Sequence, residues 1–157
     1  MKSASLSDVK NELSHLDKNE LTEICLRLAR YKKENKELLS YLLFDANDEE
    51  NYKNNIKLLI DENFEAITQT NLYLVKKSLR KILRIANKHI KYSQNKETEI
   101  DVLIHFCSVL NHSKIPYKTN KVLNNLYNSQ LKKINTCLQT LHEDLQYDFQ
   151  KKLDELS

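Results

Sequence analysis

Several histidine, cysteine and glutamate residues of this chain are spaced closely enough to suggest metal binding or catalysis. Glu12 and His15 form a Glu-x-x-His pair, the unit from which di-iron four-helix proteins build their sites. Such a site needs two of these pairs and two further glutamates that point into a bundle. This chain has one pair in a short terminal segment, so we expect no metal site and no cofactor.

Two further groups fail the same geometric test. On a helix, His105 and His112 share a face, whereas Cys107 points about 200° away from His105. One helix therefore cannot offer all three side chains to a tetrahedral zinc ion, and we expect Cys107 in the core. Cys137 and His142 lie five residues apart on one expected helix and point in different directions, unlike a nucleophile and its base. We predict no catalytic residue.

Glycine is missing from the 157 residues, and Pro116 is the one proline. Dinucleotide-binding and phosphate-binding loops need glycine for close backbone approach to phosphates, so neither type of loop can be built here. Tight hairpins also favour glycine, which argues against a sheet-rich fold. The composition predicts an all-α protein without enzymatic activity.

A basic segment interrupts an otherwise acidic chain. No acidic residue lies between Glu65 and Glu97, and that window holds eight cations. In a helix from about Thr70 to Tyr92, six of these cations fall on the side opposite the apolar residues and rise along about 21 Å. They form the candidate binding face: Lys77, Arg80, Lys81, Arg84, Lys88 and Lys91.

Like charges one turn apart repel, so something should offset this row of cations. The preceding segment offers internal acids at Asp48, Glu49, Glu50, Asp61, Glu62 and Glu65. An acidic partner protein or the phosphate backbone of a nucleic acid could also do so. The chain has only four arginines and no recognisable helix-turn-helix, zinc finger or aromatic RNA-binding platform, which disfavours nucleic acid.

Apolar residues at helical spacing recur along the whole chain. They predict six or seven amphipathic helices in antiparallel pairs, arranged as an irregular bundle or as a short α-solenoid-like stack. The length suits one domain, which we expect over residues 1–157. Asp17 to Glu20 forms a capping-box pattern at one helix start, and residues 112–117 mark the strongest break.

The last helix is expected to run without a break from about Thr119 to the end. Thirty-five helical residues span about 52 Å, more than the size of a compact domain of this length. We therefore predict that residues 142–157 project as a tail. Its apolar positions would support homo-oligomer formation through the C-terminal helix: Leu145, Phe149, Leu153 and Leu156.

Cysteine usage and hydropathy point to the cytoplasm. The three cysteines are far apart and odd in number, which is typical of reduced core residues. The first residues lack the apolar run of a signal peptide. The longest uncharged helical stretch, residues 102–113, includes two histidines and is too short to cross a membrane.

Three stretches are familiar: KKENKELL at residues 32–39, NLYLVKKSLRKILR at 71–84 and LHEDLQYD at 141–148. Together they resemble an uncharacterised family of small bacterial all-helical proteins. The resemblance covers nearly the whole chain and implies no activity, ligand or catalytic residue. The sequence therefore predicts a non-enzymatic protein-interaction module, with nucleic-acid binding through residues 76–91 as the alternative.

Overall fold

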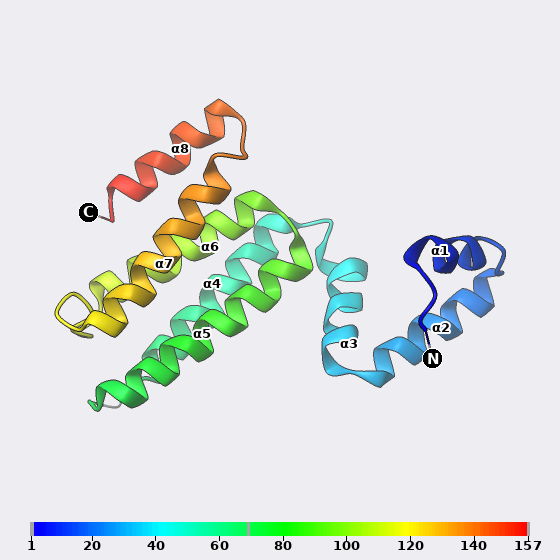
Figure 1. The fold of residues 1–157 in the computed structure, drawn as a ribbon, viewed down its shortest axis with the longest axis horizontal. Coiled ribbons are helices and arrows are strands. Elements are labelled where there is room, and N and C mark those ends of the chain that lie inside the picture. Colours follow the sequence, from blue (N-terminus) through cyan, green and yellow to red (C-terminus); the bar gives the residue numbers. More distant parts are fainter. Residues whose placement is uncertain (1, 69, 157) are drawn as a thin grey trace. The chain divides into compact units, whose positions relative to one another are not determined.

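The structure, a computed structural model, describes residues 2–68 and 70–156 (Figure 1). These residues form eight α-helices and one π-helical turn, and no strand occurs among them. The predicted all-α class is confirmed. Eight helices replace the expected six or seven, because the apolar pattern gives no sign of the break after Leu138.

The chain divides into two compact units rather than the single expected domain. An N-terminal unit comprises Met1–Phe44 and a C-terminal unit comprises Asp45–Ser157. The division follows the distribution of buried hydrophobic residues along the chain. Of the buried hydrophobic residues in the described parts of the chain, only Tyr41 belongs to the N-terminal unit.

The N-terminal unit consists of α1 (Leu6–Ser14), α2 (Lys18–Tyr31) and α3 (Lys33–Ser40), followed by the π-helical turn η1 (Tyr41–Asp45). Asp17 caps α2 by accepting from the backbone N–H groups of Asn19 and Glu20, while Glu20 accepts from the Asp17 N–H, as the capping-box pattern predicts. None of the described residues of α1, α2 and α3 is buried. Side chains cap α1 and α2 but not α3, and the described residues of the three helices lack a core of their own.

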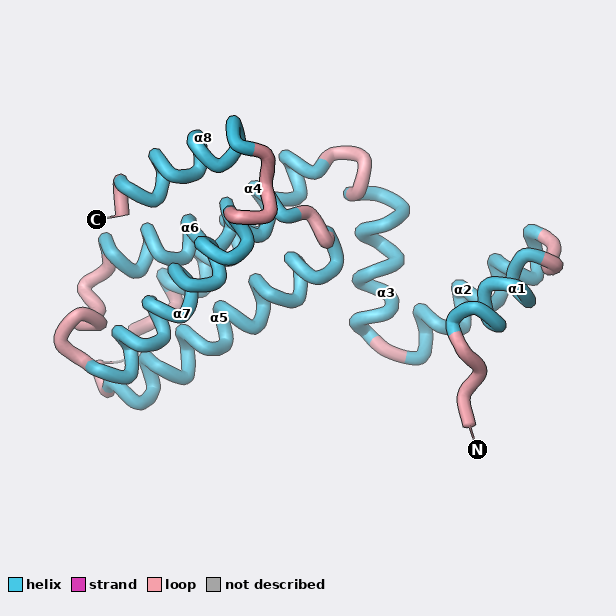
Figure 2. Tube along the Cα trace, turned by 45° about the horizontal axis from the view of Figure 1, so that its top comes forward, coloured by secondary structure: helices cyan, strands magenta, loops and turns pink. Residues whose placement is uncertain are grey.

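The C-terminal unit contains α4 (Glu49–Glu65), α5 (Leu72–Ser93), α6 (Lys96–His112), α7 (Lys121–Leu138) and α8 (Glu143–Asp154). Helix α6 lies in the middle of this unit and contacts α4, α5, α7 and α8 (Figure 2). A helix enclosed in this way is apolar nearly all round. Its fully buried apolar side chains are Ile100, Val102, Leu103, Phe106, Cys107 and Leu110.

The turn between α5 and α6 shows how helices end without glycine. Gln94 adopts the left-handed conformation at φ 56°, and its N–H donates to the Ile90 carbonyl oxygen at 2.9 Å. Asn95 then caps α6 by accepting from the N–H groups of Glu97 and Thr98. The left-handed position that glycine usually takes is therefore filled by a residue with a side chain, at some cost in backbone energy.

The expected continuous last helix is broken. Helix α7 ends at Leu138 and α8 begins at Glu143, so the prediction of one helix to the end of the chain is wrong. Local hydrogen bonds satisfy the backbone at the break: Thr140 Oγ1 donates to the Cys137 carbonyl at 2.6 Å, and Gln146 Nε2 donates to the Leu141 carbonyl at 2.8 Å. Side-chain hydrogen bonds of this kind compete with helix continuation without glycine or proline.

The predicted projecting tail instead folds back as α8 onto α6 (Figure 1). Asn111 Nδ2 donates to the Leu156 carbonyl oxygen at 2.6 Å, and Lys152 Nζ donates to Asp101 Oδ1 at 2.9 Å. Burial of the apolar face of α8 against the unit's own core removes the reason to project.

Candidate functional site

Helix α5 buries one face and exposes the opposite one. Its inward side chains are those expected from the apolar spacing: Val75, Leu79, Ile82, Leu83, Ala86 and Ile90. These residues pack against α4 and α6, the helices that α5 contacts. Because this packing fixes the rotation of α5, it also determines which side chains face solvent.

The candidate cations line the outer side of α5, and we call them the cationic face: Lys77, Arg80, Lys81, Arg84, Lys88 and Lys91. Lys88 is half-buried and the other five are exposed. The first four border a shallow groove of about 470 Å³, together with Tyr73, Lys76 and Ser78. All of these residues belong to α5, so the groove follows the surface of one helix.

Three acidic side chains of α4 contact residues other than Lys77, Arg80, Lys81 and Arg84. Glu50 pairs with Lys53 at 2.5 Å, and Asp61 Oδ1 lies 2.6 Å from His105 Nε2. Glu49 accepts from Thr98 Oγ1 at 2.5 Å. The sequence left open whether the acidic residues of α4 neutralise the cations of α5.

In the described part of the chain, four neighbouring cations of the face have no internal counter-ion. Within residues 2–68 and 70–156, no ion pair joins Lys77, Arg80, Lys81 or Arg84 to an acidic side chain. These four cations can bind a ligand whose negative charges lie in a row about one helical turn apart.

A second cationic cluster is paired internally, and it was not among the predictions made from the sequence. Asp101 of α6 is 5% exposed and lies 2.5 Å from Lys57, 2.9 Å from Lys152 and 3.5 Å from Lys53. Burial alone would raise the pKa of Asp101, but the hydrogen bonds and charges of Lys57 and Lys152 lower it to about 2. One carboxylate thus connects α4, α6 and α8.

A signal for this cluster was present in the sequence. Asp101 stands between Ile100 and Val102 in a run that is apolar on every side, where a lone acid requires a buried partner. Lys53 and Lys57 are one turn apart on α4, which precedes α6 by two helices. Only the fold shows that α4 and α8 bring their lysines to the same carboxylate.

The residues considered for metal binding have separate roles. His105 contacts Asp61, Cys107 is fully buried, and His112 Nδ1 lies 2.8 Å from the Ser108 carbonyl oxygen. In α1 and its C-cap, His15 Nδ1 lies 2.7 Å from the Asn11 carbonyl oxygen. Across the described residues, no group of three His, Cys, Asp or Glu side chains is placed to hold a metal ion.

The pair considered for nucleophilic catalysis is divided between two helices. Cys137 is buried in α7, where burial and the charge of Glu99 raise the pKa of its thiol to about 11. His142 lies at the start of α8 and accepts from the Asp144 N–H at 3.4 Å. A buried thiol with a raised pKa is a poor nucleophile at neutral pH.

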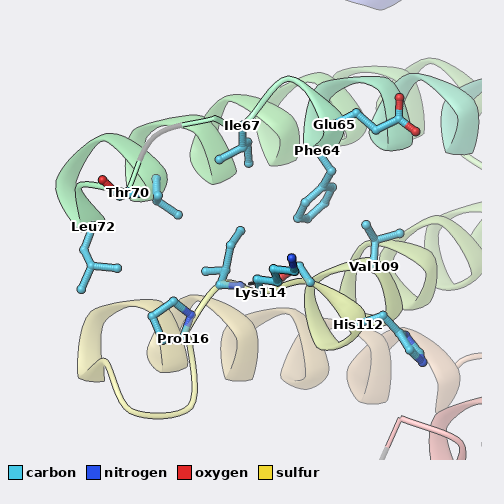
Figure 3. A pocket seen from close by; sticks show the side chains of 12 residues that line it. Phe64, Glu65, Ile67, Thr70, Leu72, Val109, His112, Lys114 and Pro116 are labelled. Carbon is cyan, nitrogen blue, oxygen red and sulfur yellow. Dashed lines mark hydrogen bonds between the residues drawn. The ribbon is translucent and has the colours of Figure 1, made fainter.

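A surface pocket of about 660 Å³ lies where α4 and α6 end and α5 begins. Figure 3 shows Phe64 and Ile67 pointing from the end of α4 toward Val109 and Lys114, while His112 points away. The lining is mainly apolar, with Lys114 as the cation within it. The break at residues 112–117 was visible in the sequence, but a hollow formed by three helix ends was not.

The predicted association tail is not an exposed apolar surface. Phe149, Leu153 and Leu156 are each less than 10% exposed, and Leu145 is half-buried. Their contacts within the C-terminal unit leave little apolar area for a second copy. Because the helix breaks after Leu138, α8 folds back and buries its apolar residues against the C-terminal unit.

None of the described helices combines the length and apolar character that a membrane span requires. Comparison with protein-family models, curated proteins and solved structures found no match for this chain. The resemblance to a bacterial family therefore stays a prediction, and the function must be inferred from the geometry and charge of the chain itself.

Proposed function

We propose that this chain is a non-enzymatic helical protein that binds an acidic segment of another protein through the cationic face of α5. The observation that carries this proposal is the row of four cations, Lys77, Arg80, Lys81 and Arg84, without an internal counter-ion among the described residues. Repulsion within the row costs free energy, which a negatively charged ligand would recover.

The shape of the face favours an extended or helical acidic segment. The cations follow one helix, so their ligand must present negative charges along a line of similar length. A second helix with acidic residues three and four apart does so at the same spacing. Charge complementarity of this kind mainly raises the association rate and fixes the orientation of the partner.

The test uses a labelled, glutamate-rich helical peptide and fluorescence anisotropy at low and physiological salt. Changing Lys77, Arg80, Lys81 and Arg84 together to Glu is expected to weaken binding at least tenfold. A matched control changes four lysines in and before α7 to Glu, with the same effect on net charge: Lys118, Lys121, Lys132 and Lys133. Equal loss in both variants, or no binding by the wild type, would contradict the proposal.

Nucleic-acid binding through the same face is the second candidate function, and Tyr73 favours it. This residue is 68% exposed at the start of α5, with Lys76 Nζ 5.5 Å from the centroid of its ring. An exposed aromatic ring beside cations suits stacking on an unpaired base. The charge of the rest of the chain argues against nucleic-acid binding. Outside residues 66–96 there are 17 cations and 22 acidic residues, and this net negative charge repels a polyanion.

The same anisotropy assay with duplex and single-stranded oligonucleotides separates the two functions. Nucleic-acid binding is expected to fall steeply as salt rises, with a slope set by the number of phosphates neutralised. It should also be weakened by Tyr73→Ala for single strands. If the oligonucleotides bind more tightly than the acidic peptide at physiological salt, the second candidate replaces the first.

A further inference from the structure

Two exposed apolar side chains precede the cationic face of α5. Tyr73 is 68% exposed and Leu74 is 42% exposed, and both come about one helical turn before Lys77. At 100° per residue, Tyr73 lies about 40° to one side of Lys77 around the helix axis, and Leu74 lies about 60° to the other side. The two side chains therefore extend the cationic face by one apolar turn.

The first turn of α5 holds these two side chains outward. Asn71 caps the helix, and its Oδ1 accepts from the Tyr73 N–H at 2.9 Å. Val75 is 3% exposed and anchors the opposite side of the same turn in the core. Lys76 Nζ lies 5.5 Å from the centroid of the Tyr73 ring, in a cation–π contact that holds the ring beside the cations. An ordered surface of this kind needs little reorganisation to bind a partner.

The apolar turn and the cations share one surface. Tyr73 borders the groove of about 470 Å³ that Lys77, Arg80, Lys81 and Arg84 also border. A ligand that contacts these cations in the groove therefore lies within reach of the Tyr73 ring. Tyrosine is enriched among the residues that contribute most to binding, because its ring buries a large apolar area while its hydroxyl keeps a polar contact. The groove thus offers an apolar contact at one end and positive charge along the rest.

We propose that the acidic segment bound by α5 carries apolar side chains at one end of its acidic row, and that these pack on Tyr73 and Leu74. This inference rests on the proposed function and adds a second requirement to it. The cations attract and orient an acidic segment. The apolar turn then selects a segment whose apolar residues lie one helical turn beyond its acids, so Tyr73 and Leu74 determine which acidic segments bind and in which register.

The test measures the binding of labelled helical peptides to the full-length protein by fluorescence anisotropy. All peptides share one row of glutamates at three- and four-residue spacing, and a plain peptide has only alanine besides. Two anchored peptides carry a pair of leucines on the face of the glutamates, one turn beyond the N-terminal or the C-terminal end of the row. A displaced peptide carries the leucines on the opposite face. The tighter anchored peptide is expected to bind at least fivefold more tightly than the plain and displaced peptides.

Variants of the protein locate the apolar contact. Tyr73→Ala with Leu74→Ala should remove the advantage of the anchored peptide and change the affinity for the plain peptide less than twofold. The matched control, Leu58→Ala with Val122→Ala, removes side chains of α4 and α7 that are 59% and 48% exposed. The control should keep the full advantage. Circular dichroism should show unchanged helical content in both variants, because all four side chains are exposed.

Salt separates the apolar contact from the charged one. Binding of the plain peptide should weaken as salt rises, because ions screen exposed charges. The ratio of the anchored to the plain affinity should stay constant between low and physiological salt, because burial of apolar area does not depend on this screening. A ratio that falls to one at physiological salt would contradict an apolar contact.

The outcomes distinguish this inference from the proposed function. A wild type that binds none of the peptides contradicts the proposed function itself. If the plain peptide binds and the anchored peptides bind no more tightly than the displaced one, the proposed function stands and the apolar requirement is wrong. An advantage that persists in the Tyr73→Ala, Leu74→Ala variant places the contact elsewhere and also overturns the inference. Single-stranded oligonucleotides that bind more tightly than the anchored peptides would assign Tyr73 to base stacking instead.

Discussion

The three cysteines differ in environment, and this predicts their reactivity. Cys107 is fully buried, and burial raises the pKa of its thiol to about 12. Cys137 is also buried, whereas Cys25 is exposed on α2. A thiol reagent at pH 8 and low protein concentration is expected to modify one thiol rapidly and the other two only on unfolding. A Cys25→Ser variant should lose the rapid phase, and a second rapid thiol in the wild type would contradict these burial differences.

Asp101 predicts a specific dependence of stability on pH. Its pKa is lowered from 3.8 to about 2 in the folded protein, so its contribution is complete above about pH 4 and is lost as the pH falls toward 2. A shift of this size corresponds to about 2 kcal/mol of unfolding free energy. Asp101→Asn should cost at least that much at pH 7, because three lysines are left without their shared carboxylate.

Urea unfolding at several pH values measures this effect, with Asp148→Asn as an exposed control on α8. The free-energy difference between Asp101→Asn and wild type should shrink between pH 4 and pH 2. A constant difference over that window, or an equal effect of the control, would show that the carboxylate is not the charged centre of this cluster.

At the scale of elements, the row of cations on α5 predicts that removing their charge raises the free energy of unfolding. Lys77, Arg80, Lys81 and Arg84 form four like-charge pairs at i, i+3 or i, i+4, and each pair costs about 0.2–0.5 kcal/mol when exposed. Changing all four to Gln should therefore raise the unfolding free energy by about 1 kcal/mol at low salt. The gain should vanish in 1 M salt, where screening acts within a few ångströms. A loss of stability would indicate an internal counter-ion for these residues.

The sequence predicted the buried face of a helix correctly where a single apolar stripe packs against a single core. In α5 the inward set from Val75 to Ile90 is confirmed, because a single stripe of period 3.6 has one way to face inward. The break between α7 and α8 could not be predicted, since both helices bury leucines at similar spacing. Thr140 and Gln146 end and restart the helix by hydrogen bonds that common residues make in many other contexts.

At the scale of the molecule, the distribution of the core was not visible in the sequence. Leu21, Ile24 and Leu28 have the same periodic spacing as Val75, Leu79 and Ile82, yet only the second group is buried. Periodicity reports that a helix has an apolar face but not what covers it. For the same reason the face in α5 could be located from the sequence. That Lys77, Arg80, Lys81 and Arg84 have no counter-ion within the described residues could be seen only from the positions of the α4 acids.

The concentration of the core in residues 45–157 predicts that the C-terminal unit folds alone. All five of its helices contribute buried side chains, and Asp101 ties three of them together. A chain of residues 45–157 should therefore unfold cooperatively, with a midpoint within a few degrees of the full-length protein, since hydrophobic burial dominates stability. Circular dichroism melts of both chains measure this. A non-cooperative melt, or a midpoint lower by more than about 10 °C, would show that residues 1–44 contribute to the core.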